Sequence, residues 1–404
     1  MKIKVNINLI IFLCTIIITG SYFLPILSKF IPTIVLCTVV ICAYGLILIN
    51  TNWYKVSSVK YSTAIILALF VFFMIDDRYK NGFVGVYALL LFFFPVLCTF
   101  YFYKKEQYGY LSKIAYFMLI IMGITSVTTY FGLINHPEIA RILATGQDSG
   151  AIMESINRNI GGFHFIYCFA LAAPLYIWGI SNKVKRRFLK VLLNLLIICF
   201  SFVLLIKAQY TIGLLLWGIA IVFSLLIKKI SFSKLLIINC VILFILICFS
   251  ADISRFFLYL ADIVNSDIIS QRFVELSSAI IGQTSSTSDM AIRTETYFKS
   301  FEAFLEHPII GGWLYNSTNG GHSFILDLLA TGGIIFGGFI LGLLALLTKF
   351  YFESGIRKNN YYLIFLFVFF LLCILNPINS SGGFLALLYT LPVGLSCTEK
   401  CELL

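Results

Sequence analysis

The feature that most constrains this chain is the recurrence of apolar runs about as long as a lipid bilayer is thick. A membrane-spanning helix needs about 20 apolar residues, because every backbone polar group must find its partner inside the helix. The third, seventh, eleventh and twelfth runs are short, so ten or eleven spans also fit the sequence. The full reading predicts twelve helices, near residues 8–27, 31–50, 62–75, 82–103, 111–133, 161–181, 191–206, 210–227, 235–251, 323–347, 361–375 and 382–396.

The composition excludes the main soluble classes. Of the 404 residues, 60% are hydrophobic and 12% are charged, whereas soluble domains are about half apolar and about a quarter charged. Disordered, collagenous, coiled-coil and disulfide-rich secreted chains are excluded on the same grounds. The predicted fold class is all-α, a polytopic membrane protein. We expect spans 1–9 in residues 1–251, a large outer loop in 252–322, and spans 10–12 with a short tail in 323–404.

The distribution of Lys and Arg predicts the orientation. If both termini are cytoplasmic, 19 of the 29 basic residues lie on the inner side, as the positive-inside rule requires. The net charge of +11 then faces anionic lipid head groups, and nucleic acid is not an expected partner. Lys2 and Lys4 precede the first span as in a signal peptide. No small-residue cleavage site follows, so a retained anchor is expected.

Two outer segments are longer than the other connections. They cover residues 134–160 and 252–322, and all four histidines lie in or beside them. Within the longer segment, apolar residues at helical spacing predict an amphipathic helix through Ile269 and Ile280. A second helix is expected from Asp289, which can cap it, to His307, where Pro308 follows. Because loops on a rigid scaffold often carry function, the outer surface is where chemistry is expected.

Two arginines on these predicted helices have two interpretations each. Arg293 lies near the edge of the apolar stripe, four residues before Tyr297. It either keeps its helix at the head-group level, with its charge reaching water, or binds phosphate oxygens through the fork of guanidinium donors. Arg272, on the preceding helix, has the same two interpretations.

His322 follows Gly320 and Gly321 and begins the tenth predicted span. The free N–H groups at a helix start favour anions and disfavour a protonated imidazole. A neutral His322 can act as a general base near neutral pH. The alternative is a polar residue that closes the helix start at the membrane interface.

Other polar residues at the outer surface are weaker candidates. Asn157 and Arg158 end the medium loop and form either a second anion site or a helix cap. Lys207 interrupts the hairpin between the seventh and eighth spans, where a cation is costly unless it faces a partner or a cavity. The alternative is an ordinary turn lysine at the membrane interface. Asp327, one turn into the tenth span, is expected to pair with one of these bases. No phosphate-binding, hydrolase or zinc-protease motif is present, and the pair Asp76-Asp77 is a weak candidate for a metal-dependent transferase site.

The end of the long loop carries a resemblance to a known superfamily. Arg293 is followed by an amphipathic helix, by HPIIGGW at 307–313, by a Gly-rich stretch and by HSFILDLLATGG at 322–333. Together with twelve spans and a late outer loop, these features resemble the O-antigen polymerase and O-antigen ligase superfamily. The motif match covers about residues 290–335, and the hydropathy pattern matches throughout. Many relatives have a Ser-Arg pair where this chain reads Lys207-Ala208-Gln209-Tyr210.

The resemblance implies a function, a location and roles for individual residues. It implies a metal-independent glycosyltransferase of lipopolysaccharide biosynthesis, in the bacterial inner membrane, that uses undecaprenyl-pyrophosphate-linked glycans at the periplasmic face. No cofactor is expected, and a chain-length regulator protein is a further expected partner. The stretch after His322 favours a polymerase over a ligase, and a lipid-linked sugar flippase is the alternative from another class. Carried over by motif, the late-loop arginine is Arg293, the histidine before the late span is His322, and the earlier outer-loop arginine is Arg158; these are the expected catalytic residues. The expected substrate-binding residues are Arg272, Lys207, Gln209, Tyr210 and Asn157.

Overall fold

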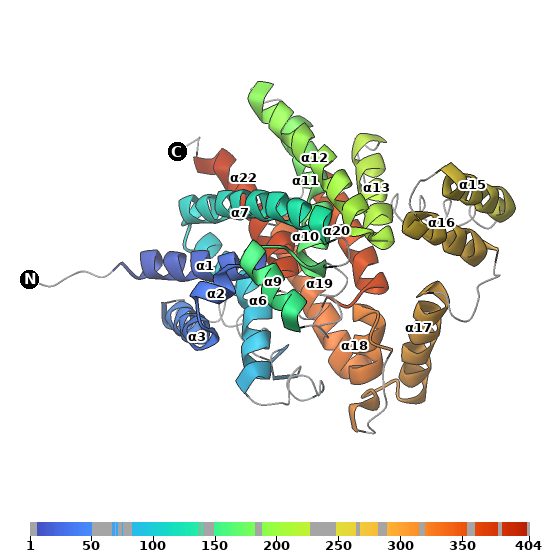
Figure 1. Cartoon of the computed structure of the whole chain (residues 1–404). Helices are drawn as coiled ribbons and strands as arrows, with labels where there is room; N and C mark the ends of the chain where they lie inside the picture. Colours follow the sequence, from blue (N-terminus) through green and yellow to red (C-terminus); the bar gives the residue numbers. More distant parts are fainter. Residues whose placement is uncertain are drawn as a thin grey trace, which may run out of the picture.

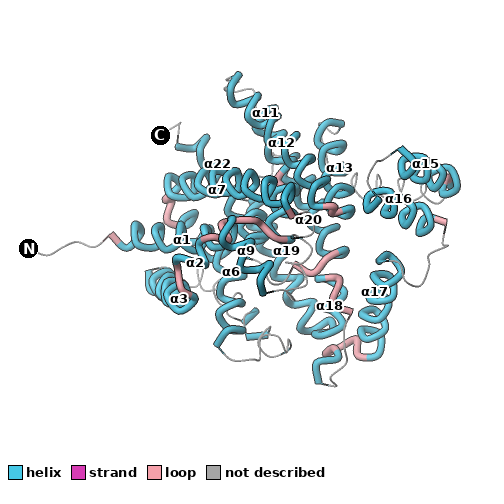
Figure 2. Tube along the Cα trace, in the orientation of Figure 1, coloured by secondary structure: helices cyan, strands magenta, loops and turns pink. Residues whose placement is uncertain are grey.

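The computed structural model is all-helical over the residues that it describes. These are 6–50, 83–136, 149–181, 188–226, 248–263, 267–281, 289–314, 320–353, 360–378 and 382–401, with a few single positions between them. Short loops join the helices of this part of the chain, and no strand occurs in it (Figure 2). The all-α prediction is therefore confirmed for the described residues.

Several helices are long and apolar enough to cross a membrane, but a count of about twelve spans is not confirmed. Four helical stretches meet both criteria, and a pair of helices bent by 46° makes a fifth if it counts as one span. The pair joins α9 (Ser149–Arg158) to the helices that follow it. The four stretches are Thr33–Asn50, Tyr87–Lys104, Tyr108–Asn135 and Phe324–Leu346.

Five further apolar helices have 10–17 residues. The predicted spans at 62–75 and 235–251 fall mostly outside the described residues. The described apolar helices are α1 (Ile7–Phe23), α3 (Thr33–Asn50), α6 (Phe83–Lys104), α7 (Tyr108–Asn135), α10 (Phe163–Leu171), α11 (Ala173–Ser181), α12 (Phe188–Ala208), α13 (Thr211–Leu226), α18 (Phe324–Gly332), α19 (Gly338–Glu353), α20 (Asn360–Leu375), α21 (Gly382–Leu385) and α22 (Leu391–Cys401).

Three of the predicted spans are interrupted. The span expected at 161–181 is divided at Ala172 into α10 and α11, with Pro174 one residue into the second helix. A π-helical turn, Gly333–Gly337, separates α18 from α19, and another, Ala386–Thr390, separates α21 from α22. Such single π-turns within helices are frequent at functional sites.

The described part of residues 250–306, most of which the sequence assigns to the long loop, contains three α-helices. α16 (Asp267–Ile280) and α17 (Asp289–Glu306) confirm the two predicted amphipathic helices. A third helix, α15 (Ser250–Ile263), was not predicted; it packs on α16 with a buried hydrogen bond of 2.6 Å between Ser254 Oγ and Ser277 Oγ. α15 and α16 lie with α17 at one side of the helical bundle, and α17 packs against α18 (Figure 1).

A proline in α6 shapes the centre of the bundle. Pro95 has no N–H, so the carbonyl of Leu91, four residues earlier, has no partner in its own helix. The Tyr22 hydroxyl, at the end of α1, donates to that carbonyl at 2.7 Å. Gly382, the first residue of α21, approaches the same point so closely that a Cβ there would lie 2.5 Å from the Leu91 oxygen. Helices from both ends of the chain are thereby packed onto the middle of α6.

Candidate functional site

A cavity of about 950 Å³ is lined by segments from the first and last parts of the chain, together with residues from the middle of the chain. Its volume is near the upper end of the range of about 300–1,000 Å³ typical of small-molecule sites. Its wall is formed by the end of α1, the short helix α2 (Leu27–Phe30), α3, α6, α9, α10 and α17, together with the turn before α18, the residues that follow α20 and the first residue of α21. Among the described residues that line it, Arg293 is the one charged residue, and none of them is a carboxylate.

Arg293 is held at the cavity by the end of α20. Its Nη1 donates to Oδ1 of Asn376 at 3.5 Å, and Asn376 is 1% exposed. One turn later on α17, the Tyr297 hydroxyl donates to the Leu375 carbonyl at 2.8 Å. Burial raises the pKa of Tyr297 and the nearby Arg293 charge opposes that rise, so Tyr297 is a neutral donor at physiological pH. These contacts fix α17 against the bundle with the Arg293 guanidinium in the cavity wall.

His322 lies on the same cavity, in the turn that leads into α18. The buried Asp327 carboxylate organises this turn, because it accepts from the N–H groups of Gly321 at 3.2 Å and Ser323 at 3.0 Å. The Ser300 hydroxyl of α17 donates to the same carboxylate at 2.6 Å and accepts from the Gly320 N–H at 2.8 Å. The histidine is thus held between two glycines and the first turn of α18.

Gly320 and Gly321 are required in this turn for different reasons. A Cβ at Gly320 would lie 2.0 Å from the Thr296 carbonyl oxygen of α17, so only glycine allows the approach. Gly321 has a φ of +75° and open space around it. L-residues with a side chain adopt that conformation only at a cost. Close packing on α17 therefore requires glycine at 320, and the backbone conformation favours glycine at 321.

The surroundings of His322 favour its neutral form. Partial burial lowers its pKa, the Arg293 charge lowers it further, and Asp327 acts in the opposite direction. A neutral His322 was also expected from the sequence, but the expected cause was the free N–H groups at the start of the following helix. Asp327, expected to pair with a base, accepts from Ser300 and from backbone N–H groups, and its charge acts on His322.

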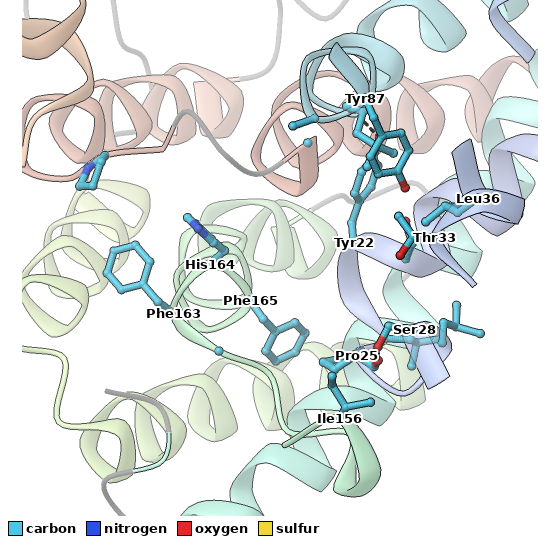
Figure 3. Close-up of a pocket in the computed structure, with 18 of the residues that line it drawn as sticks. Tyr22, Pro25, Ser28, Thr33, Leu36, Tyr87, Ile156, Phe163, His164 and Phe165 are labelled. Atoms are coloured by element: carbon cyan, nitrogen blue, oxygen red, sulfur yellow. Dashed lines mark hydrogen bonds between the residues drawn. The ribbon is translucent and has the colours of Figure 1, made fainter. Parts of the chain in front are cut away.

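The sequence analysis did not single out His164 and Asn376, which also line the cavity. Figure 3 shows His164 and Phe163 together on one side of the cavity, at the start of α10. A signal for His164 was present, since it follows Gly161-Gly162 much as His322 follows Gly320-Gly321. Asn376 had no such signal, because its role depends on the contact between α17 and α20.

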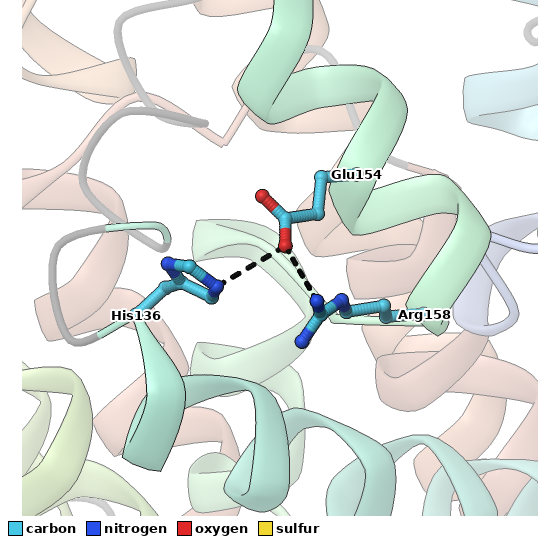
Figure 4. A network of polar contacts seen from close by, with 3 residues as sticks. All are labelled: His136, Glu154 and Arg158. Carbon is cyan, nitrogen blue, oxygen red and sulfur yellow. Dashed lines mark ion pairs between the residues drawn. The ribbon is translucent and has the colours of Figure 1, made fainter.

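Arg158 and Asn157 are not among the residues that line the cavity. Arg158 Nη2 lies 3.0 Å from Glu154 Oε1, and the same carboxylate oxygen lies 3.2 Å from Nε2 of His136 (Figure 4). Asn157 is exposed. The buried amide of this loop is Asn159, whose Oδ1 accepts from the Ile26 N–H of the chain before α2 at 3.2 Å. The catalytic role of Arg158 and the binding role of Asn157 remain predictions.

The remaining predicted residues lie around the site at different depths. Tyr210 is buried and stacks on Tyr167 with ring centres 5.5 Å apart, and it makes an edge contact with Phe163, which lines the cavity. Gln209 has a φ of +57°, and its buried Oε1 has no hydrogen-bond partner within the described ranges.

Lys207 is exposed at the end of α12. Arg272 belongs to α16, but its side chain lies outside the described part of the structure, as do Asp76 and Asp77. The cavity therefore brings together two of the three predicted catalytic residues, Arg293 and His322.

No protein-family model matches the chain, and no curated protein is significantly similar to it in sequence. What the cavity binds must therefore be inferred from the residues that line it.

Proposed function

We propose that this chain is a glycosyltransferase that uses undecaprenyl-pyrophosphate-linked glycans, specifically an O-antigen polymerase. The observation that carries the proposal is the placement of Arg293 and His322 on one cavity. A cation suited to phosphate and a neutral base suited to a hydroxyl are the two groups that the reaction requires. The superfamily resemblance of the stretch around them supports the same reaction.

The cavity fits a lipid-linked substrate. Apolar helices end or begin at it, as α1, α10, α18 and α20 do. Membrane-spanning helices end at the level of the lipid head groups, which is where the pyrophosphate of a lipid carrier lies. We place this end of the bundle at the periplasmic face of the bacterial inner membrane, with both termini cytoplasmic, as the Lys and Arg distribution predicts.

Arg293 would stabilise the charge that develops on the leaving group. A guanidinium presents donors in a planar fork that matches two phosphate oxygens at once. No carboxylate among the described lining residues pairs with that charge, so it can act on an anion in the cavity. Its contact with the buried Asn376 orients the guanidinium before substrate binds. Such preorganised charge is the main source of rate acceleration in many enzymes.

His322 would accept the proton of the attacking hydroxyl. In the proposed step, the non-reducing-end hydroxyl of a new lipid-linked repeat unit attacks C1 of the growing chain. The new O–C1 bond forms as the bond from C1 to the pyrophosphate oxygen breaks, and the electron pair leaves with undecaprenyl pyrophosphate. The hydroxyl proton passes to the imidazole, which is neutral before the step.

The direct test uses the purified protein in detergent with lipid-linked repeat units as the only substrate. Products that lengthen by whole repeat units, with loss of product on Arg293→Ala, would support a polymerase. The alternative flippase needs two membrane compartments, so extension in detergent also excludes it. Absence of any extension by the folded protein would refute the proposal.

A deletion in the bacterium that encodes the chain separates the related activities. Lipopolysaccharide with one repeat unit on its core and no ladder indicates a polymerase. Bare core with accumulated lipid-linked polymer indicates a ligase that transfers polymer to lipid A-core. Bare core with single units retained at the inner face would instead support the flippase.

A further inference from the structure

The cavity has a polar region that the proposed chemistry does not use. Ser28 of α2, Thr33 at the start of α3 and Tyr87 of α6 all line it, and we call these three residues the hydroxyl wall. Figure 3 shows them gathered on one side with Tyr22, whereas Phe163 and His164 lie on the other. The hydroxyl wall therefore faces the cavity from the N-terminal helices, away from the start of α10.

The hydroxyls of this wall are available to a ligand. The side chains of Thr33 and Tyr87 form no hydrogen bond with any part of the chain that the structure describes. Ser28 Oγ donates to the Pro25 carbonyl at 2.8 Å, which leaves its oxygen free to accept. By contrast, the Tyr22 hydroxyl is occupied by the Leu91 carbonyl. A polar group that faces a binding cavity without a partner in the protein gains one when a ligand supplies it.

The chemistry of the wall selects a neutral ligand rich in hydroxyl groups. Each Ser, Thr or Tyr hydroxyl both donates and accepts a hydrogen bond, as the hydroxyls of a sugar do. The wall carries no charge, because its three residues are a serine, a threonine and a tyrosine, and Arg293 belongs to α17. A phosphate can only accept hydrogen bonds from these hydroxyls and finds no opposite charge among them, whereas a sugar hydroxyl can both donate and accept.

We propose that the hydroxyl wall binds the sugar residues of the lipid-linked substrate whose pyrophosphate lies at Arg293. This inference rests on the proposed function, because the position of the pyrophosphate determines which part of the ligand reaches the wall. The cavity volume of about 950 Å³ leaves room beside the pyrophosphate for sugar residues. The N-terminal helices would then select the glycan, while α17 and the turn before α18 would carry out the transfer.

The test compares binding of the carrier with and without its glycan. Purified protein in lipid nanodiscs is titrated with undecaprenyl pyrophosphate alone and with the lipid-linked repeat unit. We expect the double variant Thr33→Val and Tyr87→Phe to weaken binding of the glycan-bearing lipid by about tenfold. Binding of the bare carrier should not change. Arg293→Ala should weaken both ligands, since it acts on the pyrophosphate that they share.

Matched controls lie on the same or neighbouring helices. Thr38 is an exposed residue of α3, and Tyr116 is an exposed residue of α7 that does not line the cavity. The double variant Thr38→Val and Tyr116→Phe makes the same chemical changes away from the wall. It should bind both ligands as the unchanged protein does, and its thermal unfolding serves as the reference for the wall variant.

Each outcome decides between the two proposals. If the wall variant binds the glycan-bearing lipid normally, or loses both ligands equally, the sugar site is wrong while the transferase proposal stands. If the unchanged protein binds both lipids but does not extend repeat units, the transferase proposal fails. The effect of the wall variant on binding of the glycan-bearing lipid then still tests the sugar site. An unchanged protein that binds neither lipid overturns both.

Discussion

Arg293 and Asn376 are 83 residues apart in the chain, yet the guanidinium Nη1 lies 3.5 Å from the amide Oδ1. The backbone carbonyl of Asn376 also accepts the N–H of Phe324, the first residue of α18, at 3.2 Å. One buried asparagine thus contacts both the residue proposed to bind pyrophosphate and the helix that follows His322. This explains how a loop helix and a span start can form one site.

Two substitutions of Arg293 should distinguish the contribution of its positive charge to kcat/KM from that of its planar donor geometry. Arg293→Lys keeps the charge but loses the planar fork, so we expect kcat/KM to fall by about tenfold or more. Arg293→Ala should lower it by about 10²–10³-fold, as loss of a preorganised donor does. The measurement is the rate of repeat-unit extension by purified protein. Arg255→Lys on α15, where the side chain is exposed, serves as the control. Full activity of Arg293→Lys would contradict the bidentate contact.

The acid limb of the pH–rate profile should report His322. Burial and the Arg293 charge lower its pKa, so the neutral base should persist below the ordinary histidine value of about 6.5. We expect kcat/KM to stay level through that value and to fall only in more acidic solution. His322→Ala should abolish this limb and lower the rate by about 10²–10⁴-fold. An acid limb whose apparent pKa equals or exceeds the ordinary histidine pKa would show that another group is the base. An acid limb that is unchanged in His322→Ala would show the same.

The same lowered pKa predicts how stability depends on pH. As the pH falls through the ordinary histidine value, the unfolded chain binds a proton at His322 that the folded protein still excludes. This histidine therefore contributes a loss of stability with falling pH in that range. Thermal unfolding of the protein and of His322→Ala, measured at neutral and mildly acidic pH, should show a smaller acid-induced loss in the variant.

Asp327→Asn should destabilise the turn that carries His322. An amide offers only one acceptor oxygen, so it cannot reproduce the three hydrogen bonds that the buried carboxylate accepts. We expect a loss of about 1–3 kcal/mol, measured by thermal or denaturant unfolding in detergent. Asp252→Asn on α15 is the control, because its side chain is 70% exposed. Equal effects of the two changes would refute a structural role specific to Asp327.

Alanine at the two adjacent glycines should have unequal effects. Gly320→Ala places a Cβ 2.0 Å from the Thr296 carbonyl, so α17 and the turn must separate. We expect it to abolish extension, because Arg293 and His322 would move apart. The Cβ of Gly321→Ala would contact no neighbour. The φ of +75° alone should then destabilise the folded state by about 1–2 kcal/mol. Its activity should be reduced but measurable. Comparable loss in both variants would mean that close packing at Gly320 is not the cause.

The sequence predicted the amphipathic helices well because their pattern is local. Apolar residues at helical spacing between Ile269 and Ile280 were enough to predict α16, and Pro308 was enough to predict the end of α17. The helix α15 was missed because its start overlaps the apolar run assigned to the ninth span. A run of apolar residues marks burial, but it does not mark where a chain leaves a bilayer.

The site was predicted only in part, for a related reason. Arg293 and His322 are conspicuous in the sequence, since each is a polar residue beside apolar or Gly-rich stretches. Asn376, Tyr87 and Thr33 have no such context, and only packing between distant helices brings them to the same cavity. Arg158 shows the reverse case, because its charge is equally conspicuous in sequence but pairs with Glu154.

The contact between Tyr22 and Gly382 has a consequence for biogenesis. A Cβ at Gly382 would lie 2.8 Å from the Tyr22 ring, so α21 fits directly against the end of α1. Ribosomes deliver α1 to the membrane first and α21 only after nearly all other helices have been inserted. The contact between these two helices therefore forms late in synthesis, and a nascent chain still attached to the ribosome has no complete cavity.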